Sequence, residues 1–160
     1  MSNGKIIGLS AKLRHGKDTF ADMMIGEYKL STNDDLILKI GFADPIKKAL
    51  KIIIPSIKDE WLWGSSENRG KIIEGYANPN TGGPLTVRDC LVAIGKWGRK
   101  CNVDCWVIAA METVKMYRSL GYHVIINDCR FKNEKKAIEE ALFYTGLLIG
   151  FLIDHIQILI

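Results

Sequence analysis

Residues 11–19 have the composition and spacing of a loop that binds phosphate groups. They follow an apolar run at 5–9, which predicts a strand, and they contain Gly16-Lys17 where a helical pattern begins. In such a loop the backbone N–H groups point inward, and the next helix adds the positive end of its dipole, so phosphate oxygens are held. Lys17 is expected to contact the outer phosphates. An ordinary turn between a strand and a helix is the alternative, and the basic residues within the loop favour phosphate binding.

The two residues after Gly16-Lys17 predict a magnesium site. Asp18 and Thr19 offer a carboxylate and a hydroxyl, which would hold Mg2+ directly or through water. A second role stays open for Asp18, which could instead orient or deprotonate an acceptor phosphate. The general loop pattern has Gly where Ala11 stands and Ser or Thr where Asp18 stands. The loop residues expected to bind phosphates are Ala11, Lys12, Leu13, Arg14, His15, Gly16, Lys17, Asp18 and Thr19.

Charged residues also follow two further strands that the sequence predicts. Apolar runs predict strands at 36–42 and 122–127, and Asp44 and the pair Asp128-x-Arg130 come directly after them. Because strands that alternate with helices form a parallel sheet, their carboxyl ends lie at one edge, where ligands bind. We therefore expect the loop, Asp44, Asp128 and Arg130 to meet at that edge.

The other segments supply the helices of an α/β chain. Asp44 is expected to cap a helix at 46–53. A capping box at 86–89 starts a helix, which the glycines in 95–99 are expected to break. A long helix at 103–120 follows. The remaining elements expected are helices at 17–28 and 133–144 and a last strand at 147–153.

Composition and length predict one soluble domain. The 160 residues suit a single domain, 1–160, with a lid or substrate-binding insertion at about 57–85, where the sequence is least regular. The excess of 22 Lys and Arg over 18 Asp and Glu suits a small anionic ligand and is too mild to indicate nucleic-acid binding. The apolar run at 146–160 is too short for a membrane-spanning helix. The four cysteines match no metal-binding pattern and are expected to stay reduced.

With these residues in view, the chain resembles the viral and phage deoxynucleoside monophosphate kinases, a family of P-loop phosphotransferases. The Gly-Lys-Asp-Thr form of the loop in this family accounts for Asp18. The resemblance covers much of residues 5–140 and is carried by the stretches 12–22, 42–47, 87–106 and 128–134. It implies an α/β, three-layer P-loop NTPase fold with a mostly parallel central sheet flanked by helices.

The resemblance implies transfer of the γ-phosphoryl group of ATP to a deoxynucleoside monophosphate, with ATP and Mg2+ as cofactors. Lys17, Asp18 and Arg130 are the expected catalytic residues. Catalysis of this kind is mainly positioning and charge neutralisation. Arginine suits it because its planar donor fork binds phosphate oxygens in pairs. The residues expected at the acceptor are Asp44, Arg69, Arg88, Trp97, Arg99, Asp128 and Arg130.

Two other functions stay open: another small-molecule P-loop kinase, for example of coenzyme A or isoprenoid precursors, and a nucleotide-dependent regulatory module. Asp128 could pair with Arg130, hold a water bound to Mg2+ or cap the next helix. Trp106 and His123 are expected to have structural roles. The expected partners are small nucleotides, with no nucleic acid and no membrane, and a homodimer is left open. The expected location is the cytoplasm, or the host cytoplasm for a viral protein.

Overall fold

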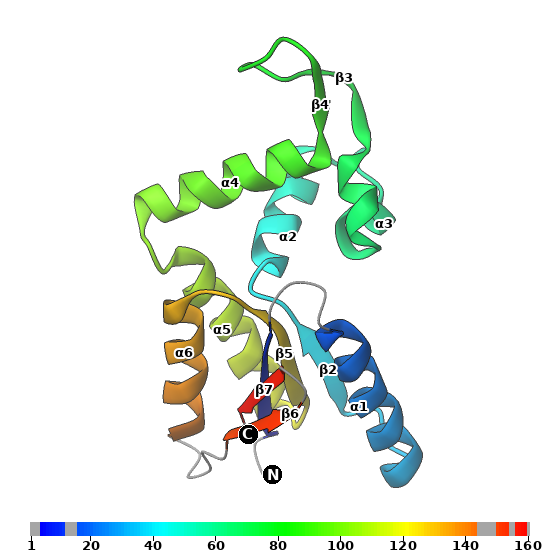
Figure 1. The fold of residues 1–160 in the computed structure, drawn as a ribbon, viewed down its shortest axis with the longest axis vertical. Helices are drawn as coiled ribbons and strands as arrows, with labels where there is room; N and C mark the ends of the chain where they lie inside the picture. Colours follow the sequence, from blue (N-terminus) through cyan, green and yellow to red (C-terminus); the bar gives the residue numbers. More distant parts are fainter. Residues whose placement is uncertain (1–3, 12–15, 144–149, 154–155, 160) are drawn as a thin grey trace. The chain divides into compact units, whose positions relative to one another are not determined.

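The computed structural model describes residues 4–11, 16–143, 150–153 and 156–159 (Figure 1). The strands are β1 Ile6–Ala11, β2 Ile37–Ile40, β3 Ile72–Ala77, β4 Pro84–Thr86, β5 His123–Cys129, β6 Gly150–Ile153 and β7 Ile156–Leu159. The helices are α1 Lys17–Thr32, α2 Asp44–Ile53, α3 Asp59–Trp63, the 3-10 helix η1 Ser66–Gly70, α4 Val87–Cys101, α5 Cys105–Ser119 and α6 Lys132–Phe143. These elements form two compact units. The first contains the described residues up to 42 and from 107 onward, and the second contains 43–106.

A small mixed sheet forms the centre of the first unit. Its strand order is β2-β5-β1-β7-β6. The three strands β2, β5 and β1 are parallel, as the alternation of strands and helices predicts. The two outer strands β7 and β6 form an antiparallel pair, and β7 is antiparallel to β1. The sequence predicts a last strand at 147–153, and β6 confirms it over Gly150–Ile153, since 147–149 lie outside the described residues. The second strand β7 and its antiparallel pairing with β6 were not predicted.

Helices cover both faces of the parallel strands. On one face, α1 packs over an apolar cluster that includes Leu9, Ala21 and Ile125. On the other face, α5 and α6 pack over a larger cluster that includes Ile126 and Ile138. Successive residues of β5 thus point to opposite faces, as a strand buried on both sides requires. This flanked sheet agrees with the α/β class expected from the sequence.

The second unit has its own apolar core. Helices α2, α3 and α4 and strand β3 contribute to it, with Leu50, Leu62, Ile73 and Val87 all nearly inaccessible to solvent. The insertion expected at about 57–85 lies within this unit, where it forms α3, η1 and the antiparallel hairpin β3-β4.

Two expectations about helix ends in the second unit are wrong. Asp44 does not cap α2, because Ala43 is the N-cap and Asp44 is already in the first turn. Helix α4 is not broken at 95–99 but continues to its end at Cys101. The capping box that starts α4 is confirmed, with the Thr86 hydroxyl and the Asp89 carboxylate bonded to each other's backbone N–H groups.

The glycines of α4 do not break the helix. They let the Trp106 side chain pack closely against it. The Trp106 indole Nε1 donates a hydrogen bond to the Gly95 carbonyl at 3.1 Å. A Cβ atom at Gly98 would lie 2.4 Å from carbon atoms of the Trp106 ring. Small residues on this face of α4 therefore let the indole lie against the helix backbone, which gives Trp106 the structural role expected for it.

Candidate functional site

The turn into α1 places a glycine in the left-handed conformation directly before Lys17. Gly16 is the N-cap of α1 and has φ 71°, in the left-handed region, where a side chain is strained. Its carbonyl accepts the first helical hydrogen bond, from the Phe20 N–H at 2.9 Å. Lys17 follows as the first helical residue and is only 7% exposed. Lysine is rarely buried to this degree, so its burial in the first turn of α1 indicates a specific role.

Part of the predicted loop lies outside the described residues. Lys12, Leu13, Arg14 and His15 are in this group, and the structure therefore does not test them. Ala11 is the last residue of β1, which runs directly into the loop.

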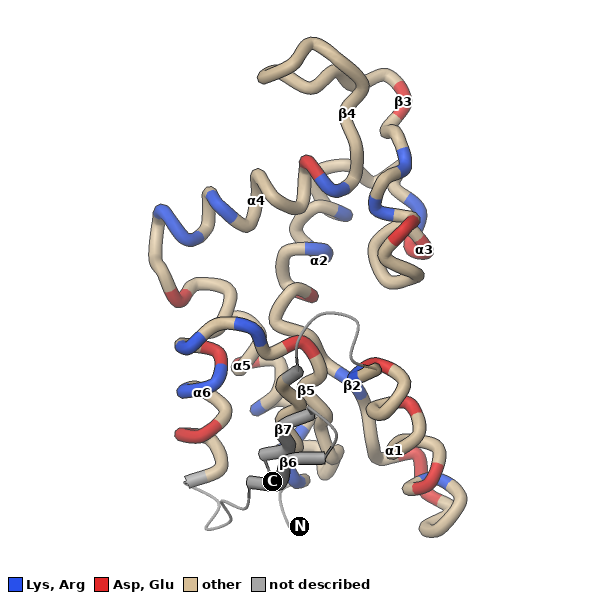
Figure 2. Tube along the Cα trace, viewed as in Figure 1, with Lys and Arg blue, Asp and Glu red and all other residues tan. Residues whose placement is uncertain are grey.

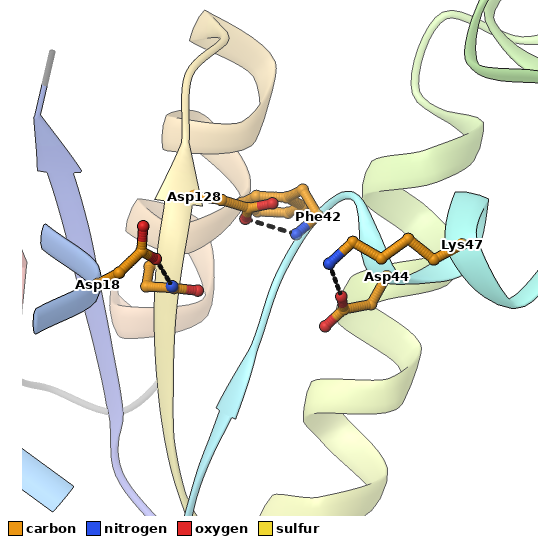
Figure 3. Close-up of polar contacts among 6 residues, drawn as sticks. Asp18, Phe42, Asp44, Lys47 and Asp128 are labelled. Carbon is orange, nitrogen blue, oxygen red and sulfur yellow. Dashed lines mark hydrogen bonds and ion pairs between the residues drawn. The ribbon is translucent and has the colours of Figure 1, made fainter. Parts of the chain in front are cut away.

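Asp18 is connected to the neighbouring strand β5. The Asn127 amide Nδ2 donates a hydrogen bond to the Asp18 carboxylate Oδ1 at 2.5 Å (Figure 3). Asp18 itself is exposed, and Asn127 is 7% exposed. The start of α1 and the end of β5 therefore lie together, as expected for groups at one edge of a parallel sheet.

A bulge in β5 sets the directions of its last residues. Gly8 of β1 lies opposite Ile126, but Ser10 lies opposite Cys129, so two residues along β1 correspond to three along β5. Cys129 consequently packs in the same cluster as Ile126, although regular alternation would place it on the other face. Strand β5 also runs two residues further than the predicted strand at 122–127, so Asp128 belongs to the bulge and does not follow the strand.

Asp128 binds the turn after β2, a strand that ends at Ile40, two residues before the end of the predicted strand at 36–42. Its Oδ1 atom accepts a hydrogen bond from the Phe42 backbone N–H at 2.6 Å (Figure 3). A Cβ atom at Gly41 would lie 2.9 Å from Asp128 Oδ2, so a glycine permits this close approach. The carboxylate thus has a structural role at the sheet edge. Its expected contact with the phosphate-accepting substrate stays a prediction.

Arg130 follows β5 directly and has an exposed side chain. Its backbone is held by Glu134, whose Oε2 atom accepts hydrogen bonds from the N–H groups of Arg130 at 2.6 Å and Phe131 at 3.0 Å. Burial raises the pKa of the Glu134 carboxyl, the two N–H groups lower it, and the nearby charge of Asp128 raises it further. The carboxylate lies at the N-terminus of α6, where the helix dipole favours negative charge.

Cys129 is an unreactive thiol within this edge. Burial raises its pKa to about 12, and the charges of Glu134 and Asp128 act in the same direction. The Lys17 charge acts against the shift. The thiol is therefore protonated at neutral pH and poorly nucleophilic.

The residues at the start of α1 fit a magnesium ion that takes most of its ligands from substrate phosphates and water and only a few from the protein. Among the described residues, no three or more His, Cys, Asp and Glu side chains gather into a metal site. Mg2+ is commonly bound through one or two carboxylates together with substrate phosphates and water. The exposed Asp18 carboxylate, with the Thr19 hydroxyl beside it in sequence, is a donor set of that kind.

The other predicted acceptor residues belong to the second unit. The Asp44 carboxylate meets the Lys47 ammonium at 2.8 Å (Figure 3). Arg88 Nη2 donates to the Ser66 carbonyl at 3.2 Å, which joins the first turn of α4 to η1, the helix that contains Arg69.

Helix α4 has an exposed basic surface. Figure 2 shows its Lys and Arg residues, which are Arg88, Lys96, Arg99 and Lys100. The Trp97 side chain is 65% exposed on the same helix. All of these candidates belong to the second unit. That they form one acceptor site with Asp128 and Arg130 stays a prediction.

Comparison with protein-family models, curated proteins and solved structures returns no match to this chain. None of the helices in the described part of the chain is long and apolar enough to cross a membrane.

Asn127, Glu134 and Gly41 are site residues that sequence reasoning did not single out. Asn127 is the first polar residue after the apolar run of β5, and this position was a readable signal. Glu134 stands four residues after Arg130, near the start of the next helix, where an acidic residue is typical of a capping interaction. For Gly41 the sequence holds no comparable signal, because its constraint comes from Asp128.

Proposed function

We propose that the chain is a nucleotide kinase with a P-loop fold that transfers the γ-phosphoryl group of ATP to a deoxynucleoside monophosphate. The observation that carries the proposal is the turn into α1, where a left-handed Gly16 precedes the buried Lys17 and Asp18 is joined to the end of β5. The Gly-Lys-Asp-Thr motif and the Asp128-x-Arg130 motif support the same function through the resemblance stated above.

The proposed roles follow from charge and position. Lys17 and the loop N–H groups hold the phosphates of ATP and neutralise the charge on the transferred group. Bound Mg2+ supplies further charge neutralisation, and Asp18 and Thr19 are the residues that would hold it. Arg130 lies directly after β5, where its guanidinium can bind the acceptor phosphate.

The second unit supplies the remaining acceptor candidates in this proposal. Arg69, Arg88 and Arg99 offer cationic forks for a phosphate, and the exposed Trp97 offers a surface on which a base stacks. Asp44 is the acidic member of the set, and its ion pair with Lys47 would have to rearrange for it to contact the acceptor.

The test is ADP formation from ATP and Mg2+ with a panel of deoxynucleoside and ribonucleoside monophosphates. A kinase of this kind shows ADP formation that rises steeply with one or a few of the monophosphates. Slow hydrolysis that no monophosphate stimulates would indicate the regulatory module and overturn the proposal. Stimulation by a different phosphate acceptor, and not by a nucleoside monophosphate, would indicate another small-molecule kinase.

A substitution at Lys17 tests the assignment of the loop. Lys17→Met keeps much of the buried stem and removes the ammonium, so we expect a loss of acceptor-stimulated activity of roughly 100-fold or more. Lys29→Met is the matched control, because Lys29 lies in the same helix and forms a surface ion pair with Asp35. Full activity in folded Lys17→Met protein would refute the role of the loop.

A further inference from the structure

Asn127 is a buried polar residue at the end of an apolar strand. The three residues before it, Val124, Ile125 and Ile126, are at most 1% exposed, and Asn127 is 7% exposed. A buried side-chain amide is unfavourable unless it forms hydrogen bonds. The Asn127 side-chain amide is therefore expected to have a specific hydrogen-bond partner.

That partner is Asp18, far away in the sequence. The amide Nδ2 of Asn127 donates to the Asp18 carboxylate Oδ1 at 2.5 Å, across 109 residues of chain. Asp18 is exposed, so without this bond its carboxylate could rotate among several side-chain conformations. A neutral donor restrains the carboxylate and leaves its negative charge in place, whereas a lysine would neutralise it and an aspartate would repel it.

The bulge in β5 is located at this contact. The extra residue of β5 lies between Ile126 and Cys129, which are the positions opposite Gly8 and Ser10 of β1. Bulges redirect side chains and are frequent beside active sites. Here the bulge contains both Asn127, which bonds α1, and Asp128, which bonds Phe42 in the turn after β2.

We propose that Asn127 is a positioning residue that orients the Asp18 carboxylate for Mg2+ bound together with ATP. This inference rests on the proposed function, since it assigns Asp18 to the metal. A hydrogen bond from a second residue to a metal-binding carboxylate fixes its direction, and loss of such a bond typically reduces metal affinity or activity 10–100-fold.

The test measures ATP binding by calorimetry, in EDTA and across a series of Mg2+ concentrations. Asn127→Leu has a similar volume and lacks the donor, so we expect the Mg2+ concentration for half-maximal enhancement of ATP binding to rise roughly 10–100-fold. ATP affinity in EDTA is expected to stay as in the wild type. Thr113→Val is the control, because it removes a part-buried side-chain hydrogen bond, to the Ala109 carbonyl, elsewhere in the same unit.

The pair is then examined in a double-mutant cycle with Asp18→Asn. If Asn127 acts through Asp18, Asn127→Leu has no further effect on the Mg2+ dependence in the Asp18→Asn background. An equal effect in both backgrounds, or an unchanged Mg2+ dependence in folded Asn127→Leu protein, would overturn the inference. If Asn127→Leu does not fold, Asn127→Ser, which is too short to reach the carboxylate, is expected to give the same result and decides the question.

The wild type separates this inference from the proposed function. Wild-type protein that binds ATP without any dependence on Mg2+, or that does not bind ATP, overturns the positioning role. Mg2+-dependent ATP binding that Asn127→Leu weakens, in a protein without acceptor-stimulated ADP formation, supports the positioning role and rejects the kinase.

Discussion

The candidate residues at the sheet edge of the first unit and those of the second unit are held in different ways. In the first unit the contacts join distant parts of the chain, since Asn127 lies 109 positions after Asp18 and Asp128 lies 86 positions after Phe42. In the second unit the Asp44 carboxylate meets Lys47 within one helical turn. Arg88 reaches 22 residues back, to the carbonyl of Ser66.

The difference follows from the elements that carry the residues. Parallel strands buried on both faces bring their carboxyl ends together, so the polar groups there bond one another before any ligand is present. On α4, by contrast, the Trp97 side chain is 65% exposed, and Arg88 is held by the carbonyl of Ser66 in a neighbouring short helix. Long-range hydrogen bonds thus hold the Asp18 and Asp128 carboxylates in place in the first unit, whereas an exposed side chain such as Trp97 is ordered only when something binds it, at an entropic cost.

The largest expected effect comes from Gly98→Ala, which tests whether α4 must lie close to Trp106. The added Cβ would be 2.4 Å from the indole carbons, so we expect a loss of about 3 kcal/mol in the free energy of unfolding. Gly26→Ala in α1 is the matched control, because nothing lies within 4 Å of its added Cβ. It should gain up to about 1 kcal/mol from helix propensity. Chemical denaturation measures both variants, and equal stability of the two would contradict the packing described.

The next effect separates the two roles of Asp128. Asp128→Ala removes the acceptor of the Phe42 N–H, and we expect a loss of about 2 kcal/mol in the free energy of unfolding. Asp128→Asn keeps an acceptor oxygen and should unfold near the wild-type denaturant concentration. If Asp128 also contacts the acceptor of the proposed reaction, acceptor-stimulated ADP formation falls in Asp128→Asn although its stability does not. If activity falls only in the destabilised Asp128→Ala and stays at the wild-type level in Asp128→Asn, Asp128 has a purely structural role.

A smaller effect is expected at the start of α4. Thr86→Ala removes the hydroxyl that accepts the Asp89 N–H at 3.2 Å, and loss of such a cap should lower the melting temperature by about 2–4 °C. Thr86→Ser keeps the hydroxyl and serves as the control. Because α4 carries Arg88, Trp97 and Arg99, a fall in kcat without a change in the Mg2+ dependence of ATP binding would assign α4 to the acceptor. A loss confined to ATP binding would contradict that assignment.

The smallest effect is a pH dependence at the opposite end of β5. The His123 Nδ1 atom accepts the Lys5 N–H at 2.9 Å, and burial together with the Lys5 charge lowers the pKa of the imidazole. A lowered pKa in the folded state means that stability is present above the unfolded value near 6.5 and is lost as the pH falls below it. His123→Asn keeps an acceptor that does not titrate, so between pH 7.5 and 5.5 it should lose less stability than the wild type. Thermal melting measures both proteins across this pH range. Melting temperatures that fall equally with pH in the wild type and in His123→Asn would contradict the proposed linkage.

Local signals in the sequence predicted the elements well where one short stretch carries the information. The Gly16-Lys17 turn and the capping box at 86–89 are of this kind, because their geometry depends on a few adjacent residues. The break expected at 95–99 was wrong because those glycines are required by Trp106, which a local pattern does not reveal. Asp44 was mistaken for a cap because a first-turn aspartate and an N-cap aspartate have the same sequence context.

The sequence by itself determined the α/β class, the start of α1 at a Gly-Lys pair and the capping box that begins α4. Its apolar periodicity and turn residues specify these features locally. Only the tertiary structure decided that β5 contains a bulge, that Asn127 bonds Asp18 and that Asp128 bonds Phe42. These features depend on the register between β1 and β5 and on pairs of residues more than eighty positions apart, and such register and pairing arise only when the sheet and its helices pack together.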